Sequence, residues 1–404
     1  MSDPKEGVEF LRHVSEVENV NRLDGLEDLR FRYGDQWLNY MVTARSVIGQ
    51  ERPMLTINEV DAYCRKVENQ QKQQRPRIKV HAVDDIADPK IAKVCSGLMR
   101  HIEVNSNADN AYDKAFSHAL TIGWGYMRMR TDYIRENSFD QDIFIDQVEN
   151  PFTVYFDDQS SLPDGSDAEK CLITDMVKKK KFEKDFPGAS IQGFSEIGSG
   201  DVQTDWVTQE DIRLAEYYYV ERKKAELVML SNKQAYWFDQ IDPAKLDQYG
   251  LTVVGTRPSV RKVVKWCKQT SFEILEEKVI PGRWIPVIPV YGSSYIVDGK
   301  RSRFGLVRFG KDPARMNNYW QSSITEVLAL SPKAKWLVAA GSIEGFENEW
   351  AQANQSTRAT LTWNDKDEDL QPLQKPEHIQ PEPPPAGMIQ AVMMASQNLQ
   401  RVMG

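Results

Sequence analysis

Three charged side chains come closest to forming a catalytic set. Asp164 follows Pro163, and Glu221 precedes Lys223 by two positions. This order loosely imitates a metal-dependent nuclease, in which carboxylates hold a divalent cation beside a phosphate. The two carboxylates are far apart in the chain, however, and a chain with 59 Asp and Glu residues matches such patterns by chance. We therefore expect no enzyme, and we keep a nuclease-like DNA-processing subunit as the alternative.

Other motifs of catalysis and cofactor binding are incomplete or missing. No GxxxxGK[ST] sequence is present that would cradle phosphates. The segment Gly123–Gly125 lacks the third glycine of a dinucleotide-binding loop, and Gly193–Ile197 departs from the G-x-S-x-G nucleophile elbow at its last position. The five histidines form no HExxH, and the four cysteines form no CxxC. We expect no metal, no cofactor, and reduced thiols.

The charge of the chain limits its partners. The formal net charge is −8 over 404 residues, whereas proteins that grip nucleic acid neutralise phosphates with clustered Lys and Arg. Lys178–Lys181 is a run of four lysines without interleaved aromatic residues, which favours a solvated helix face. A net negative charge still permits a protein that lets DNA slide past without binding it tightly. No apolar run approaches the roughly 20 residues that span a bilayer, so we expect no membrane contact.

One helix stands out as the element around which the chain is organised. We expect it to begin at Asp312 as the N-cap, with Pro313 at the first helical position, and to end at Ser331 before Pro332. Three- and four-residue spacing gives it one apolar stripe of about five turns. The stripe consists of Met316, Tyr319, Trp320, Ile324, Val327 and Leu328.

The helix is followed by an excursion that ends in a second helix. From Gln371 to Pro385, six of fifteen residues are proline, which favours an extended rod. A helical pattern resumes at Ala386 and runs to the end of the chain. The excursion is therefore predicted to be a compact projection, with a proline-rich linker to another domain as the simpler alternative. Its expected features are extended residues 336–338, a segment 346–353 carrying Trp350, a strand at 360–363 and an acidic run at 365–369.

The residues before this helix predict an α+β region. Asp88-Pro89 is a typical helix start, and alternating apolar residues predict strands. Helices are expected at residues 8–48, 59–74, 88–102 and 111–120. Strands are expected at residues 77–82, 126–130, 139–148, 152–156, 212–220, 225–238, 261–275 and 285–292.

In four places the sequence resembles the portal proteins of tailed double-stranded DNA bacteriophages, of the type found in short-tailed phages (podoviruses). The places follow one another in the expected order and cover nearly the whole chain. They are Tyr33–Trp37; Arg52–Asn58 with Val67–Gln70 and Arg75–Ile78; Ser138–Ile143 through Asn150–Phe152; and Gly305–Arg308 through Lys311–Pro313 and Asn318–Trp320.

The resemblance implies a non-enzymatic ring of about twelve identical subunits at one capsid vertex. Double-stranded DNA would pass through its channel, without sequence specificity, during genome packaging and ejection. The implied partners are the terminase large subunit, a tail adaptor or head-completion protein, and the capsid and scaffold proteins. The implied location is the virion, after assembly in the host cytoplasm. Because the subunits are acidic, we expect the channel to repel phosphates and let DNA pass with low friction.

The resemblance also implies a division of the chain into a wing (1–310, α+β), a first stem helix (311–332), a small β-containing clip (333–385) and the start of a second stem helix (386–404). Proteins of this type normally continue into a channel loop, a long kinked helix and a crown, so the end at Gly404 implies either a truncated or partial chain or a missing section that is supplied otherwise.

Candidate site residues follow from this mapping. The channel-facing cations would be Arg315, Lys333 and Lys335, which either guide DNA or pair with acids of a neighbouring subunit. The stem-packing residues would be Met316, Trp320, Ile324, Val327 and Leu328. The clip residues that contact partners would be Trp336, Trp350, Trp363, Asp367, Glu368 and Pro383.

Overall fold

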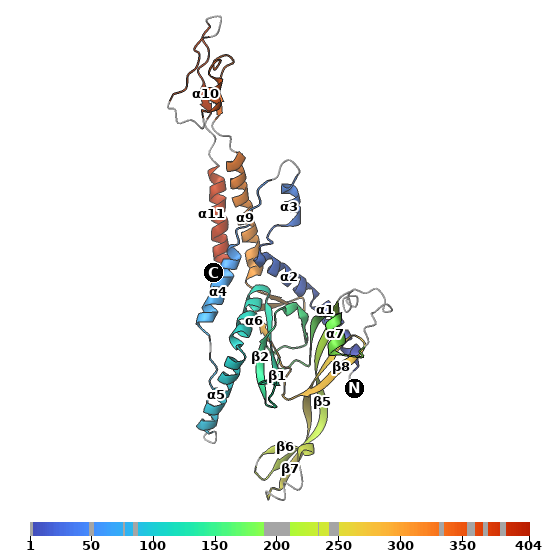
Figure 1. Cartoon of the computed structure of the whole chain (residues 1–404). Coiled ribbons are helices and arrows are strands. Elements are labelled where there is room, and N and C mark those ends of the chain that lie inside the picture. Colours follow the sequence, from blue (N-terminus) through green and yellow to red (C-terminus); the bar gives the residue numbers. More distant parts are fainter. Residues whose placement is uncertain are drawn as a thin grey trace. The chain divides into compact units, whose positions relative to one another are not determined.

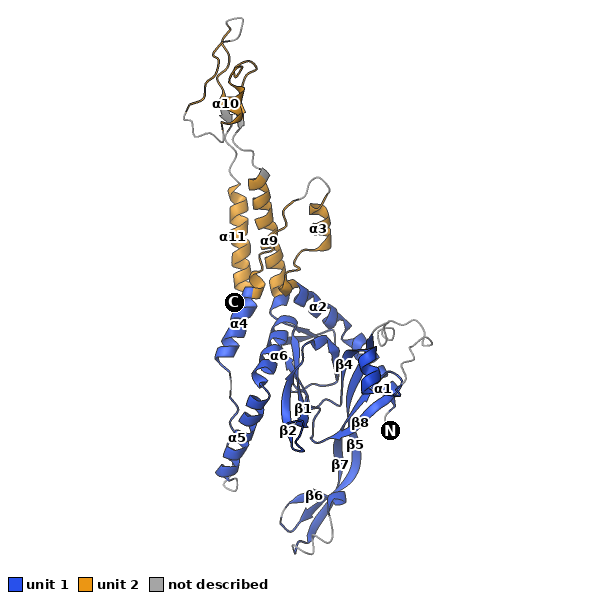
Figure 2. Ribbon diagram, in the orientation of Figure 1, with its two compact units in different colours: residues 1–30, 62–308 blue, residues 31–61, 309–404 orange. Residues whose placement is uncertain are grey.

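The structure is a computed structural model, and it forms two compact units (Figure 2). Unit 1 comprises residues 1–30 and 62–308, and unit 2 comprises residues 31–61 and 309–404. The division joins residues 31–61 to the C-terminal part of the chain, which the sequence did not indicate. The residues described are 3–47, 52–75, 77–83, 88–189, 211–232, 234–241, 250–330, 335–353, 360–366, 371–379 and 385–404.

Local sequence signals set the ends of several helices, which are labelled in Figure 1. Asp3 and Asp88 each accept a hydrogen bond from the backbone N–H two residues on, at 3.0 and 2.8 Å, which confirms the Asp-Pro helix start. Gly123 ends α6 with a positive φ of 100°. The helices that lie wholly or mostly in unit 1 are α1 (Pro4–Val17), α2 (Asn19–Tyr33), α4 (Glu59–Gln73), α5 (Pro89–Asn105), α6 (Ala108–Ile122) and α7 (Lys179–Asp185).

Antiparallel sheets form the centre of unit 1. One sheet has the order β2-β1-β9, from β2 (Gln141–Gln147), β1 (Trp124–Tyr133) and β9 (Val287–Tyr291). The larger sheet has the order β3-β4-β5-β7-β8, from β3 (Val154–Phe156), β4 (Lys170–Lys178), β5 (Asp211–Leu230), β7 (Val253–Gln269) and β8 (Ile274–Ile280), with β6 (Ala235–Trp237) paired to β5. A hairpin joins β10 (Ser293–Val297) to β11 (Lys300–Phe304).

The core of unit 1 is apolar and well covered. Ile122 of α6 is fully buried in a cluster with Trp124 and Tyr126 of β1 and with residues of β3, β4 and β9. A second cluster packs Phe10, Leu11 and Val14 of α1 against the larger sheet. Burial of such side chains stabilises a fold by roughly 1.5–3 kcal/mol each. The prediction of an α+β region is confirmed.

Unit 2 contains a helix pair and a small excursion. Figure 1 shows α9 (Val307–Leu330) beside α11 (Ala386–Met403). A side chain at Gly310 of α9 would lie 2.6 Å from Sδ of Met403, so the two helices approach closely there. Between them, β12 (Lys335–Leu337) pairs with β13 (Glu377–Ile379), which closes the excursion at its base. Unit 2 also holds α3 (Asn39–Arg45) and α10 (Glu347–Ala351).

Three sequence expectations are wrong. The helix expected to begin at Asp312 begins at Val307, and Pro313 lies inside it rather than at its first position. The described residues 77–83 and 360–363 form no strand. Apolar alternation in such short runs predicts a strand only when a neighbouring strand pairs with it, and tertiary context decides that pairing.

Candidate functional surfaces

The buried side of α9 is largely polar. Asn318 and Ser322, one helical turn apart, accept hydrogen bonds from the backbone N–H groups of Ile57 and Leu55, both at 2.9 Å. Four residues of helix span about 6.0 Å, and two residues of extended chain span about 6.6 Å. Because these two lengths are similar, the N–H groups of Leu55 and Ile57 can both reach side chains that lie one helical turn apart on α9.

A chain of buried amides continues this contact within unit 2. The Asn318 side-chain amide donates to Oε1 of Gln36 at 2.6 Å. Gln36 in turn donates to Oδ1 of Asn58 at 2.9 Å, and Asn58 donates to the Arg32 carbonyl at 2.7 Å. Because each amide has a partner, burial of these groups does not carry the penalty of an unpaired polar atom. Amide and hydroxyl groups thus replace apolar contacts on this side of α9.

Arg45 fixes α3 to the same helix. Its guanidinium contacts Glu326 at 3.4 Å, donates to Ser323 Oγ at 3.0 Å, and lies 4.9 Å from the ring centroid of Tyr319. It also donates to the Pro53 carbonyl at 3.0 Å. Polar and aromatic positions of α9 are therefore occupied by residues 31–61 of the same chain.

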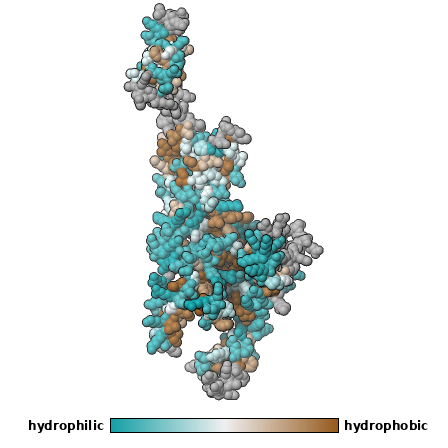
Figure 3. All heavy atoms as spheres, viewed as in Figure 1, coloured by the Kyte–Doolittle hydropathy of each residue, from teal (hydrophilic) through white to brown (hydrophobic). Residues whose placement is uncertain are grey.

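The expected stem stripe lies outside this buried side. Met316 is 51% exposed and Leu328 is 55% exposed, and Trp320, Ile324 and Val327 are half-buried. On α11, Ala395, Leu399 and Met403 are buried, whereas Ile389, Met393, Met394 and Val402 are exposed. Hydrophobic residues are visible on this helix pair in Figure 3. The described part of its own chain therefore buries the stem stripe only in part.

Of the three candidate channel cations, Arg315 has contacts within its own chain. Arg315 is 19% exposed, and its guanidinium lies 3.6 Å from Asp312, 3.4 Å from the Gln36 carbonyl and 5.3 Å from the ring centroid of Phe31. It is thus engaged within unit 2. Lys333 lies outside the described residues. Lys335 is the first residue of β12.

The excursion brings aromatic side chains together. The rings of Trp336 and Trp350 meet edge to face at 5.3 Å, and the Trp350 indole donates to the Thr362 carbonyl at 2.7 Å. Trp363, the third candidate, is half-buried next to Asn364, whose backbone N–H donates to the Ser342 carbonyl at 2.8 Å. Trp336 and Trp350 therefore help hold the excursion together. Asp367, Glu368 and Pro383 lie outside the described residues.

The nuclease-like set is not assembled for catalysis. Asp164 accepts a hydrogen bond from the Ser166 N–H at 3.1 Å, which lowers the pKa of its carboxyl. The Glu221 carboxylate lies 3.1 Å from Lys265 and 3.4 Å from Lys223, and its hydrogen bond with Lys265 lowers its pKa. Among the described residues, no group of three or more His, Cys, Asp or Glu side chains is placed to hold a metal ion.

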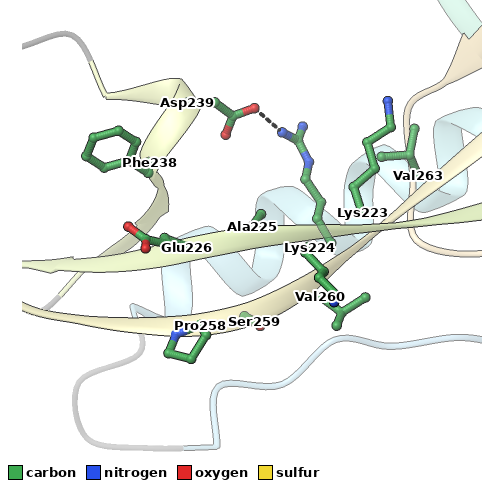
Figure 4. Close-up of a pocket in the computed structure, with 11 residues that line it drawn as sticks. Lys223, Lys224, Ala225, Glu226, Phe238, Asp239, Pro258, Ser259, Val260 and Val263 are labelled. Atoms are coloured by element: carbon green, nitrogen blue, oxygen red, sulfur yellow. Dashed lines mark hydrogen bonds and ion pairs between the residues drawn. The ribbon is translucent and has the colours of Figure 1, made fainter.

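An open hollow of about 1050 Å³ lies between β5, β7 and the residues Phe238 and Asp239 that follow β6 (Figure 4). The dashed line in Figure 4 marks the 2.8 Å ion pair between Asp239 and Arg261. Lys223 and Lys224 also line it, with apolar residues such as Val260 and Val263. Its described lining contains charged groups of both signs.

Comparison with known proteins gives one consistent result. The sequence profile of the family described as phage P22-like portal protein matches residues 9–404. A portal protein of Acyrthosiphon pisum secondary endosymbiont phage 1 is 25% identical over 406 aligned positions, which cover 94% of this chain and 55% of the relative. The chain thus spans about half the length of that relative. Within the described residues, no helix has the length and apolar character needed to cross a membrane. The chain belongs to the phage P22-like portal protein family.

Proposed function

We propose that this chain forms the ring at a capsid vertex through which double-stranded DNA is packaged and ejected. The observation that carries the proposal is the exposed apolar stripe of α9, whose other side is already occupied by residues 31–61 of the same chain. A cyclic ring requires each subunit to bury two different surfaces against its neighbours. The stripe and the exposed residues of α11 are suited to such burial.

The excursion between β12 and β13 is the proposed docking element. Its Trp336–Trp350 pair gives it internal structure, and Leu337 remains exposed beside them. Its proposed partners are the terminase large subunit and later a tail adaptor or head-completion protein. The capsid and scaffold proteins would contact the ring elsewhere. We expect deletion of residues 361–385 to abolish terminase docking and to leave unit 1 folded, and docking by the deleted chain would show that the element is misplaced.

The channel is proposed to repel DNA. Twelve subunits of net charge −8 would carry roughly twelve times that charge, which opposes phosphate binding along the channel wall. The few cations near the α9 end, Arg315, Lys333 and Lys335, would guide the duplex or pair with acids of the next subunit. Arg315 already has partners within its own chain, which supports a structural role for it.

Electron microscopy of the purified chain tests the proposal. Closed rings with a central hole are the expected result. A monomer at every protein concentration would overturn the ring. A monomer that cleaves DNA in the presence of Mg²⁺ would establish the alternative, a nuclease-like packaging subunit.

A further inference from the structure

The strands β5 and β7 extend beyond the sheet as a two-stranded ribbon. β4 pairs with β5 up to Tyr219, and β8 pairs with β7 from Val264 onward. Residues 221–226 and 258–263 therefore pair only with one another. Figure 1 shows these strands leaving the larger sheet towards β6. Within the described residues, the outer edges of this ribbon segment consequently have no strand partner, and the face with Lys223 and Arg261 also meets Asp239.

Like charges face each other across the ribbon. The register places Arg222 opposite Lys262, and Lys223 opposite Arg261. Successive residues of a strand point to opposite faces, so each face carries one cross-strand pair of cations. Directly opposed like charges destabilise a strand pair. The arrangement therefore favours an anionic partner that lowers this repulsion.

Neighbouring carboxylates offset these cations only in part. Arg222 is paired with Glu169, Lys223 lies 3.4 Å from Glu221, and Arg261 lies 2.8 Å from Asp239. These pairs are at least partly exposed to solvent, where an ion pair contributes little stability and is screened by salt. Glu226 lies further along the ribbon. For Lys224, Arg257 and Lys262, no ion pair is recorded among the described residues.

The shape and the charge of the ribbon together indicate its partner. A two-stranded ribbon fits the major groove of duplex DNA, which is about 12 Å wide and has a phosphate backbone on either side. Cations on both faces match such a partner, whereas an acidic peptide would engage one face or one edge. The hollow beside Lys223 and Arg261 gives a backbone room to approach. We propose that this ribbon binds duplex DNA through its phosphates without reading sequence.

This proposal goes beyond passage through a channel. It assigns DNA binding to one element of an otherwise acidic chain, and it holds for a subunit whether or not a ring has formed. If the ribbon does not bind DNA, the proposed ring is unaffected. If no ring forms, DNA binding by the ribbon can still be tested on the free chain.

Fluorescence anisotropy of a labelled random-sequence duplex, titrated with the full chain at several salt concentrations, tests the proposal. The variant Lys223→Glu with Arg261→Glu should weaken binding at least tenfold, and the slope of log K against log salt should fall by about 2. A second variant, Lys224→Ala with Lys262→Ala, keeps the Arg261–Asp239 pair and should weaken binding less. Circular dichroism should show that both variants are folded.

The matched control is Lys180→Glu with Lys181→Glu in α7, which makes the same change in charge at exposed lysines. It should leave binding within about twofold. An equal loss in this control would indicate a general charge effect and overturn the site. Binding of polyglutamate but not of the duplex would assign the ribbon to an acidic protein. Ribbon variants that fail to assemble but bind DNA as before would assign it to a second copy of the chain. Each of these results would overturn the proposal.

Discussion

The two units bury different kinds of side chain at their centres. In unit 1, Ile122, Trp124 and Tyr126 are packed in an apolar cluster between a helix and two sheets. In unit 2, the side of α9 that meets residues 31–61 presents Asn318 and Ser322, and the apolar stripe of α9 is partly exposed. Unit 1 therefore has an apolar centre, whereas the contact of α9 with residues 31–61 in unit 2 is largely polar.

Met316 and Leu328 are exposed apolar side chains on the stripe of α9 in unit 2. An exposed contiguous apolar surface is rare on monomers and indicates an interaction site. Polar contacts fix register because each donor must meet its own acceptor, so the Asn318–Gln36–Asn58 chain holds one arrangement of unit 2 before assembly. Hydrogen bonds thus help to hold unit 2 in shape, and Met316 and Leu328 of its stripe remain exposed.

The largest effect is expected in the apolar core of unit 1. Ile122→Ala removes a fully buried side chain from this cluster and should lower the free energy of unfolding by about 4 kcal/mol, because a cavity remains. Urea denaturation measures this loss. The control Ile296→Ala removes the same atoms from an exposed position and should cost much less. Equal losses in the two variants would show that this cluster is not the main core.

The next effect tests the polar side of α9. Asn318→Leu leaves the Ile57 N–H and Gln36 Oε1 without the partners they have now, and should cost about 3 kcal/mol because Gln36 is buried and Ile57 is half-buried. Asn398→Leu at an exposed position of α11 is the matched control and should change stability little. If the two variants unfold alike in urea, the amide chain does not stabilise unit 2, and the contrast between the units fails.

Local signals in the sequence predicted many elements of unit 1. Asp88-Pro89 fixed the start of α5, and the helix expected at 59–74 is α4 at Glu59–Gln73. These ends depend on side chains within a turn of the chain, which a single sequence displays. At Pro313 the same logic failed, since a proline at an expected first position did not prevent the helix from extending back to Val307.

The polar contact of α9 and the cation pairs of the β5–β7 ribbon depend on long-range contacts that sequence patterns do not display. The contact of Asn318 with Gln36 joins residues 282 positions apart, and it uses amides, whereas helical periodicity was read from apolar residues only. The one available signal was the polar pair Asn317-Asn318 inside an otherwise amphipathic helix. The opposed cations Lys223 and Arg261 could not be paired without the register of β5 and β7.

A smaller effect on the free chain is expected at the exposed stripe. Met316→Glu with Leu328→Glu should change the stability of the free chain by less than about 0.5 kcal/mol per site, because both side chains are exposed and Glu is a good helix former. The same variant should prevent ring formation, as measured by size-exclusion chromatography with light scattering. Thr325→Glu with Ala329→Glu, also exposed on α9, is the control and should still assemble. Normal rings from the stripe variant would show that unit 2 is covered elsewhere.

The smallest effect concerns the edge of unit 1, where α5 meets α6. Burial, together with the Glu103 carboxylate 3.3 Å from its hydroxyl, raises the pKa of Tyr112 to about 12. An unfolded chain would ionise this phenol near pH 10, so its contribution to stability is present below that pH and is lost as the pH rises towards 12. Tyr112→Phe should therefore make the stability of the chain fall less steeply over this interval, and phenolate absorbance should show one late-titrating group fewer. Glu103→Gln removes the charge but not the burial, and should lower the pKa of Tyr112 only in part. If Tyr112 ionises at its ordinary pH in the folded chain, the α5–α6 contact is open to water and the apolar core of unit 1 ends before it.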